Sequence, residues 1–341
     1  MGKEKNLYIE TLRGLAILLV VIGHVIGSTP DGGMKIAYPS PFRYLYLFID
    51  FIQMPLFTAI AGFVYAYRPV GSDYLKKFTV KKVYRLLIPM ITVGTLYFLM
   101  QYFTPGTNKK GVLSDIWQIY VLPYTIYWYL PSLFLIFMVI ALIDVNNFAK
   151  TVKGALICLL VSIVLMYVEE TKLIPDGVPN VLSFKGALLQ LPYFIIGVMA
   201  CRFRSDGIPK SINAVAWILA VVAIVAIQVE WFKPETHDAI RNLICPLLVM
   251  PVLLLLLQSK WQNKFFVYIG SFAYSIYLFH VFFTGGVRIL LARVGITAQL
   301  PVFCGALIIA TILPILAEIL ISKSKILSVL LLGKTPKVTQ K

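Results

Sequence analysis

Two ionisable residues in the first apolar stretch of the chain, Arg13 and His24, have types and a spacing that could do chemistry. Ionisable groups inside a bilayer cost several kcal/mol or need partners, so they mark candidate functional sites. Eleven positions separate the two residues. On an α-helix this spacing places them on one face, about 16 Å apart along the axis. A long, thin molecule lying along that face would put an anionic head at Arg13 and its far end at His24.

Acyl-CoA has this form, and histidine suits its chemistry. A neutral imidazole, with an ordinary pKa of about 6.5, can take a proton from a sugar hydroxyl while that hydroxyl attacks the thioester carbonyl. The imidazole could instead attack the carbonyl itself and give an acyl-histidine intermediate. In a purely structural reading, His24 bonds a neighbouring helix, and Arg13 reaches lipid phosphate while it pairs with Glu10 three residues earlier. These alternatives stay open at this point.

Two further ionisable residues, Asp50 and His280, are expected at the depth of His24. Asp50 lies about seven residues into the second apolar stretch, and His280 lies about sixteen residues into the ninth. Asp50 could orient the His24 ring and fix its tautomer, as a carboxylate does in a catalytic triad, or it could pair with Arg43. His280 could bind the acceptor, tune His24 or simply pack in the core.

A basic segment and an aromatic pair complete the candidate site. Residues 74–85 are predicted to form a loop in which Lys82 and Arg85, three positions apart, could grip one phosphate if the chain takes a helical turn there. Membrane orientation alone also produces such basic loops. Trp128 and Tyr129 open the fourth apolar stretch, where they could stack on a sugar ring or serve as interfacial anchors.

Membrane helices must position these residues. The chain of 341 residues is 59% hydrophobic and 13% charged, with a mean hydropathy of +0.85, whereas soluble proteins carry about 25% charged residues. Its apolar stretches are long enough to cross a hydrocarbon core of about 30 Å. We therefore expect an all-α integral membrane protein of about ten transmembrane helices, with spans near 7–27, 43–67, 86–104, 124–144, 151–168, 184–201, 211–229, 239–257, 264–289 and 299–321.

Charge predicts how the chain is oriented and organised. An even number of spans puts both termini on one side, and the segments on that side hold about twice as many Lys and Arg as the others. The positive-inside rule then makes both termini cytosolic. One membrane domain over 1–322 and a basic cytosolic tail over 323–341 account for the chain. A basic cytosolic face would also concentrate a polyanion such as a coenzyme A thioester.

The sequence also argues against other classes of partner. The formal net charge is +16, but the basic residues are spread over short loops and form no stripe, so no nucleic-acid partner is expected. The four cysteines have neither CxxC spacing nor a neighbouring histidine. They predict no metal site.

Taken together, these residues resemble the acyltransferase-3 family of bacterial membrane acyltransferases. Two positions depart from the family pattern: Lys82 stands where arginine is usual and replaces a planar fork with a point charge, and Ala61 removes a serine hydroxyl common in the second block. The likeness rests on four segments in order along the chain: Leu12–Ala16 with Gly23 and His24, Met54–Phe57 with Ala61–Phe63, Lys82–Arg85 with Pro89, and Gly270–His280.

The resemblance implies transfer of an acetyl or short acyl group from cytosolic acetyl-CoA, or another acyl-CoA, to a hydroxyl of a surface polysaccharide or lipid-linked sugar, in the bacterial cytoplasmic (inner) membrane. Arg13, His24, Lys82 and Arg85 match the family's functional motifs. A transporter or flippase for a lipid-linked glycan is the main alternative, because intramembrane His, Asp and Arg also suit a permeation path. Against it, the sequence shows no inverted repeat. A structural or sensory membrane protein whose basic loops bind lipid is a third possibility. The acceptor, acyl length, chemical route and oligomeric state stay open.

Overall fold

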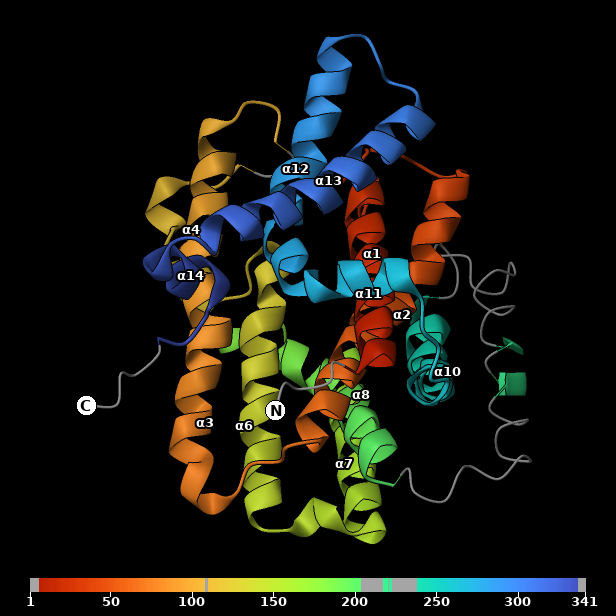
Figure 1. Ribbon diagram of the computed structural model, residues 1–341. Coiled ribbons are helices and arrows are strands. Elements are labelled where there is room, and N and C mark those ends of the chain that lie inside the picture. Colours follow the sequence, from red (N-terminus) through yellow and green to blue (C-terminus); the bar gives the residue numbers. More distant parts are fainter. Residues whose placement is uncertain (1–5, 108–109, 204–216, 220, 223–237, 337–341) are drawn as a thin grey trace.

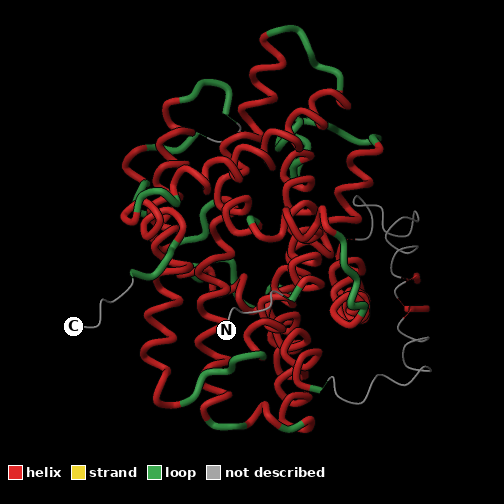
Figure 2. Tube along the Cα trace, in the orientation of Figure 1, coloured by secondary structure: helices red, strands yellow, loops and turns green. Residues whose placement is uncertain are grey.

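The computed structural model describes residues 6–107, 110–203, 217–219, 221–222 and 238–336. All regular elements in these residues are helices (Figure 2). Eight helical segments among them are long and apolar enough to cross a membrane. For the described residues, the predicted all-α class with multiple membrane-spanning helices is confirmed.

Most predicted spans agree with an observed helix. α1, α2, α4, α6, α7, α8 and α13 match predicted spans to within a few residues. The principal helices are α1 (Leu7–Ile26), α2 (Pro41–Ala66), α3 (Leu75–Lys82), α4 (Ile88–Phe103), α6 (Tyr129–Val145), α7 (Val152–Glu170), α8 (Phe184–Arg202), α10 (Asp238–Gln258), α11 (Lys264–Ser271), α12 (Ala273–Arg293), α13 (Gln299–Ile321) and α14 (Lys325–Leu332).

Two predicted spans have no full counterpart among the eight. The span at 211–229 lies mostly outside the described residues. The span at 239–257 corresponds to α10, in which Ile244–Gln258 is the apolar stretch among the described residues. The count of ten spans and the cytosolic location of both termini therefore stay predictions.

Two local predictions need correction. The segment 74–85 is helical and not a loop, because neither Gly nor Pro interrupts it, and α3 continues through a π turn (Val83–Leu87) into α4. The predicted span 264–289 breaks at Phe272 into α11 and α12. The predicted basic tail after Ser322 contains α14, which packs beside α4 (Figure 1), and its location on the cytosolic side stays a prediction.

Glycines allow the helices around the site to touch backbone to backbone. A Cβ on Gly14 of α1 would lie 2.0 Å from the Phe266 carbonyl oxygen of α11, and one on Gly270 would lie 2.0 Å from the Glu10 carbonyl oxygen. Gly62 makes a similar approach between α2 and α8. Small residues at helix crossings are typical of membrane proteins, in which close packing drives association. These crossings fix α1 and α2, which carry His24 and Asp50.

Polar contacts tie the remaining helices together. Asp144 of α6 accepts two hydrogen bonds from the guanidinium of Arg202 on α8, and both side chains are almost completely buried. The Tyr127 hydroxyl donates to the Leu278 carbonyl at 2.9 Å, and the Tyr277 hydroxyl donates to the Ile126 carbonyl. This reciprocal pair fixes the short helix before α6 (Thr125–Trp128) against α12.

Connections between the helices gather at the two ends of the bundle. In Figure 1 the connections from α1 to α2 and from α12 to α13 lie at one end of the bundle, and those from α2 to α3 and from α6 to α7 lie at the other.

Candidate active site

Two cavities lie between the helices, and the candidate residues are divided between them. The first, which we call the histidine chamber, has a volume of about 510 Å³ and contains His24 and Asp50 in its wall. The second, the basic chamber, has a volume of about 580 Å³ and contains Arg13, Lys82 and Arg85. The structure thus groups the two predicted catalytic residues in one cavity and the three predicted donor-binding residues in the other.

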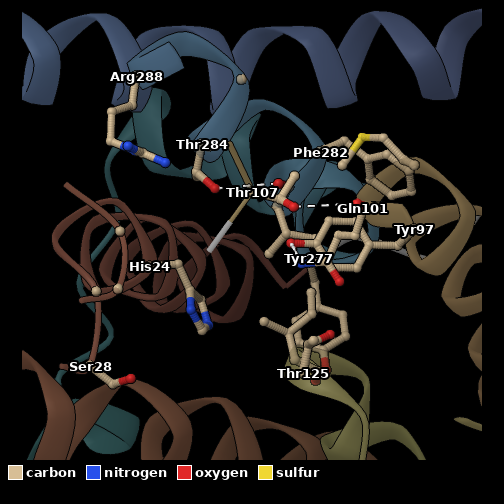
Figure 3. Close-up of a pocket in the computed structure, with 18 of the residues that line it drawn as sticks. His24, Ser28, Tyr97, Gln101, Thr107, Thr125, Tyr277, Phe282, Thr284 and Arg288 are labelled. Atoms are coloured by element: carbon tan, nitrogen blue, oxygen red, sulfur yellow. Dashed lines mark hydrogen bonds between the residues drawn. The ribbon is translucent and has the colours of Figure 1, made fainter. Parts of the chain in front are cut away.

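His24 projects from α1 into the histidine chamber (Figure 3). The imidazole is half-buried and lies two residues before the end of α1. The carbonyls that end this helix are capped by Arg43, whose Nη2 donates to Ile26 at 2.9 Å and also to Gly27. Arg43, which the sequence offered as a partner for Asp50, thus holds the end of the helix that presents His24.

The ring of His280 lies beside that of His24, with centroids 5.1 Å apart. His280 is fully buried, and its Nδ1 lies 2.8 Å from the Ile276 carbonyl oxygen and 2.9 Å from that of Tyr277. Because carbonyls only accept, Nδ1 must carry the proton, and Nε2 of the neutral ring holds a lone pair. His280 is absent from the residues that line the chamber. It touches the site through His24.

Asp50 is held by side chains of its own helix. Its Oδ1 accepts a hydrogen bond from the Tyr46 hydroxyl at 2.9 Å and one from Gln53 Nε2 at 3.1 Å. The Gln53 amide packs against Gly23, where a Cβ would come within 2.5 Å of its Oε1. The carboxylate is therefore positioned next to the turn of α1 that carries His24, and its orienting role stays a prediction.

The rest of the histidine chamber is rich in hydroxyl and amide groups (Figure 3). Trp128 contributes an indole, and Arg288 contributes a guanidinium from α12. The polar lining residues include Ser28, Tyr97, Gln101, Thr104, Thr107, Thr125 and Thr284.

Five cations and one carboxylate line the basic chamber. Arg13 pairs with Glu10 at 2.7 Å, so the predicted i,i+3 pair is present, yet both side chains also face the cavity. The positive charges come from α1, the end of α2 and the α3 to α4 helix. They are Arg13, Arg68, Lys81, Lys82 and Arg85.

The irregular helix at Val83–Leu87 sets the position of Arg85. π turns are uncommon and often occur at functional sites. Pro89 has no N–H to donate to the carbonyl four residues back, and that Arg85 carbonyl accepts from the Tyr274 hydroxyl instead. The Arg85 guanidinium lies 3.6 Å from the centroid of the Tyr274 ring, and its Nη1 donates to the Leu332 carbonyl at 2.8 Å. Lys82 Nζ lies 3.2 Å above the centroid of the Phe137 ring.

The structure separates residues that the sequence placed together. Arg13 and His24 line different chambers and not one continuous cavity. Trp128 faces the histidine chamber, whereas its neighbour Tyr129 faces the basic chamber. Tyr277 lines both chambers.

The tyrosines of α12 were missed as site residues. Tyr274, Tyr277 and His280 recur every three positions, so their spacing could have indicated that the two tyrosines share one face of a helix with His280. The chain as described holds no group of three His, Cys, Asp or Glu side chains placed to bind a metal ion. The expectation of a metal-free reaction stays a prediction.

A comparison of the chain with protein-family models gives a match over most of its length. The acyltransferase-3 family model, described as an acyltransferase domain, matches residues 6–319. Neither the search of curated proteins nor the search of solved structures gave a significant match. Because the family match covers nearly the whole chain, this multi-pass membrane protein belongs to the acyltransferase-3 family and is an acyltransferase.

Proposed function

We propose that the protein transfers an acetyl or short acyl group from cytosolic acyl-CoA to a hydroxyl of a surface polysaccharide or lipid-linked sugar in the bacterial inner membrane. The observation that carries this proposal is the pair of chambers, one lined by cations and the other by a histidine and many hydroxyl groups. A donor with several phosphates and an acceptor with several hydroxyls are the substrates that fit them.

The basic chamber suits the phosphates of coenzyme A. Arg13 and Arg85 present planar guanidinium groups that can bind phosphate oxygens in pairs, and Lys82 adds a point charge. Packing on Tyr274 holds Arg85 in place before the donor arrives. The donor's thioester end would then extend toward Tyr277 and the histidine chamber.

The histidine chamber suits the transfer step. Nε2 or Nδ1 of neutral His24 takes the proton of the acceptor hydroxyl as its oxygen bonds to the thioester carbonyl carbon. The carbon–sulfur bond breaks, and the imidazolium returns the proton to the departing thiolate. The carboxylate of Asp50 favours the imidazolium that forms between these events. An acyl-histidine route uses the same residues in two steps.

The lining of the histidine chamber suits a carbohydrate. Threonine and serine hydroxyls and the Gln101 amide can exchange hydrogen bonds with sugar hydroxyls, and the Trp128 indole offers an apolar face. Arg288 adds a positive charge that favours an acidic sugar or a lipid-linked pyrophosphate.

Radiolabelled acetyl-CoA tests the proposal. The purified protein is incubated with labelled donor and a crude glycan extract, and the carbohydrate is then separated and counted. Label on the carbohydrate supports acyl transfer. If the protein is placed in vesicles and the glycan crosses their membrane without becoming labelled, the result contradicts acyl transfer and favours the flippase.

A further inference from the structure

Three aromatic rings from three different helices meet where the two chambers approach each other. Phe57 comes from α2, Tyr129 from α6 and Tyr277 from α12. Their centroids are 6.3 Å apart for Phe57 and Tyr129, 6.3 Å for Phe57 and Tyr277, and 5.9 Å for Tyr129 and Tyr277. Each pair lies within the distance of ordinary aromatic contact, so the three rings form a closed triangle.

The triangle lies between the chambers. All three rings line the basic chamber, and Tyr277 also lines the histidine chamber. Met54, one turn before Phe57 on α2, already faces the histidine chamber, as does Trp128, the residue before Tyr129. On α2 and on the segment entering α6, the residues just before these rings therefore line the histidine chamber, and the rings themselves line the basic chamber.

The two tyrosines are tethered, whereas the phenylalanine has no polar group to tether. The Tyr277 hydroxyl donates to the Ile126 carbonyl, and the Tyr129 hydroxyl lies 3.1 Å from Thr58 Oγ1. Both tyrosines are almost fully buried. Phe57 is only half-buried and faces the basic chamber. A rotation of its χ1 angle breaks no hydrogen bond.

We propose that Phe57, Tyr129 and Tyr277 form a gate between the chambers, and that the Phe57 ring is its moving part. The inference rests on the proposed function, because the group that passes the gate is the acyl-thioester arm of the donor. When Phe57 lies in the triangle, water and ions cannot pass from one chamber to the other, and the bound thioester is kept away from His24, which would otherwise activate water against it in the absence of acceptor. When the ring turns aside, the thioester reaches His24.

Thiol labelling tests the gate without relying on acyl transfer. The four native cysteines are replaced by alanine, and a reporter cysteine is placed in the histidine chamber by Ser28→Cys or in the basic chamber by Ala61→Cys. Inside-out vesicles are treated with the anionic, membrane-impermeant 2-sulfonatoethyl methanethiosulfonate. With the native gate, we expect Ala61→Cys to react and Ser28→Cys to be protected.

Opening the gate should expose the reporter cysteine of Ser28→Cys in the histidine chamber. Phe57→Ala should raise the rate of Ser28→Cys labelling several-fold, and Phe57→Leu, which preserves more of the side-chain volume, should raise it less. Val64→Ala is the matched control, because Val64 lines the basic chamber on the same helix but is not part of the triangle. It should leave Ser28→Cys protected. Equal labelling of Ser28→Cys with and without Phe57→Ala, or rapid labelling of Ser28→Cys behind the native gate, overturns the proposal.

A second measurement separates the gate from the reaction. With acetyl-CoA and no acceptor, Phe57→Ala should release free thiol several-fold faster than the parent protein, because the thioester reaches His24, which can activate water in place of the acceptor hydroxyl. If Phe57→Ala opens the path to the thiol reagent but neither protein acylates a glycan, the gate stands and the proposed function fails. If transfer occurs and the labelling of Ser28→Cys never depends on Phe57, the function stands and the gate fails.

Discussion

At the scale of single residues, Arg85 has the most defined environment among the cations of the basic chamber. Its guanidinium is held between the Tyr274 ring and the Leu332 carbonyl. A hydrogen bond to a charged group contributes about 1.5–3 kcal/mol. We therefore expect Arg85→Ala to raise the KM for acetyl-CoA by about 10- to 100-fold with a much smaller effect on kcat, as measured by initial rates of labelled transfer.

Lys77→Ala is the control for that experiment. Lys77 lies on α3 but is exposed and does not line the chamber. The two substitutions remove one positive charge each from the same region. An equal effect of both on KM would mean that general surface charge, and not a specific grip by Arg85, attracts the donor.

Replacing Asp50 with asparagine tests the catalytic step separately from donor binding. Asp50→Asn keeps an oxygen that can accept from Tyr46 and Gln53 but removes the charge that stabilises an imidazolium. By analogy with the carboxylate of a triad, kcat should fall by about 10²-fold or more while the KM for the donor changes little. A change in KM with unaltered kcat would contradict an orienting role and assign Asp50 to binding.

At the scale of elements, the crossing of α1 and α11 fixes the helix that carries both Arg13 and His24. A Cβ on Gly14 would lie 2.0 Å from a backbone oxygen of α11, so Gly14→Ala must push the two helices apart. Overpacking of this kind costs about 1–3 kcal/mol. We expect a lower Tm in detergent micelles together with reduced turnover.

Gly71→Ala is the matched substitution for Gly14→Ala, because no atom lies within 4 Å of the Cβ that it adds. Its effect on stability should stay within about 0.5 kcal/mol. If Gly14→Ala melted at the same temperature as Gly71→Ala, the close contact of α1 and α11 would be disproved.

The positions of most helices could be predicted from the sequence, and the exceptions have physical causes. Uninterrupted apolar stretches located α1, α2, α4, α6, α7, α8 and α13, because the bilayer allows few alternatives to a helix. Hydropathy could not reveal that the basic segment before α4 is helical, since charged residues can extend a helix beyond the apolar core. Nor could it show the break at Phe272, because a single glycine such as Gly270 is also tolerated inside a continuous helix.

The site followed from the sequence only in part. Arg13 and His24 were found because ionisable residues are rare in apolar stretches. Their separation into two chambers depends on Phe57, Tyr129 and Tyr277, aromatic residues that sequence alone cannot distinguish from ordinary core packing. Contacts between distant helices, such as that of Arg85 with α14, leave no pattern in a single sequence.

At the scale of the whole molecule, the reaction requires the two chambers to open toward opposite sides of the membrane. The positive-inside rule predicts that Lys323 faces the cytosol and that Lys35 faces outward. With the native cysteines replaced, Lys35→Cys should be labelled by an impermeant maleimide in intact cells, and Lys323→Cys only after the membrane is opened. The reverse pattern would place the basic chamber on the wrong side for cytosolic acyl-CoA.

In the proposed reaction, His24 performs the proton transfer between two substrates held in separate chambers. The decisive measurement is the rate at which the purified His24→Ala protein moves labelled acetyl from acetyl-CoA to the glycan, with its melting temperature measured in parallel. We expect a loss of kcat of about 10²- to 10⁴-fold, the usual contribution of general acid–base catalysis, with the protein still folded. Wild-type turnover by folded His24→Ala would contradict this role of His24.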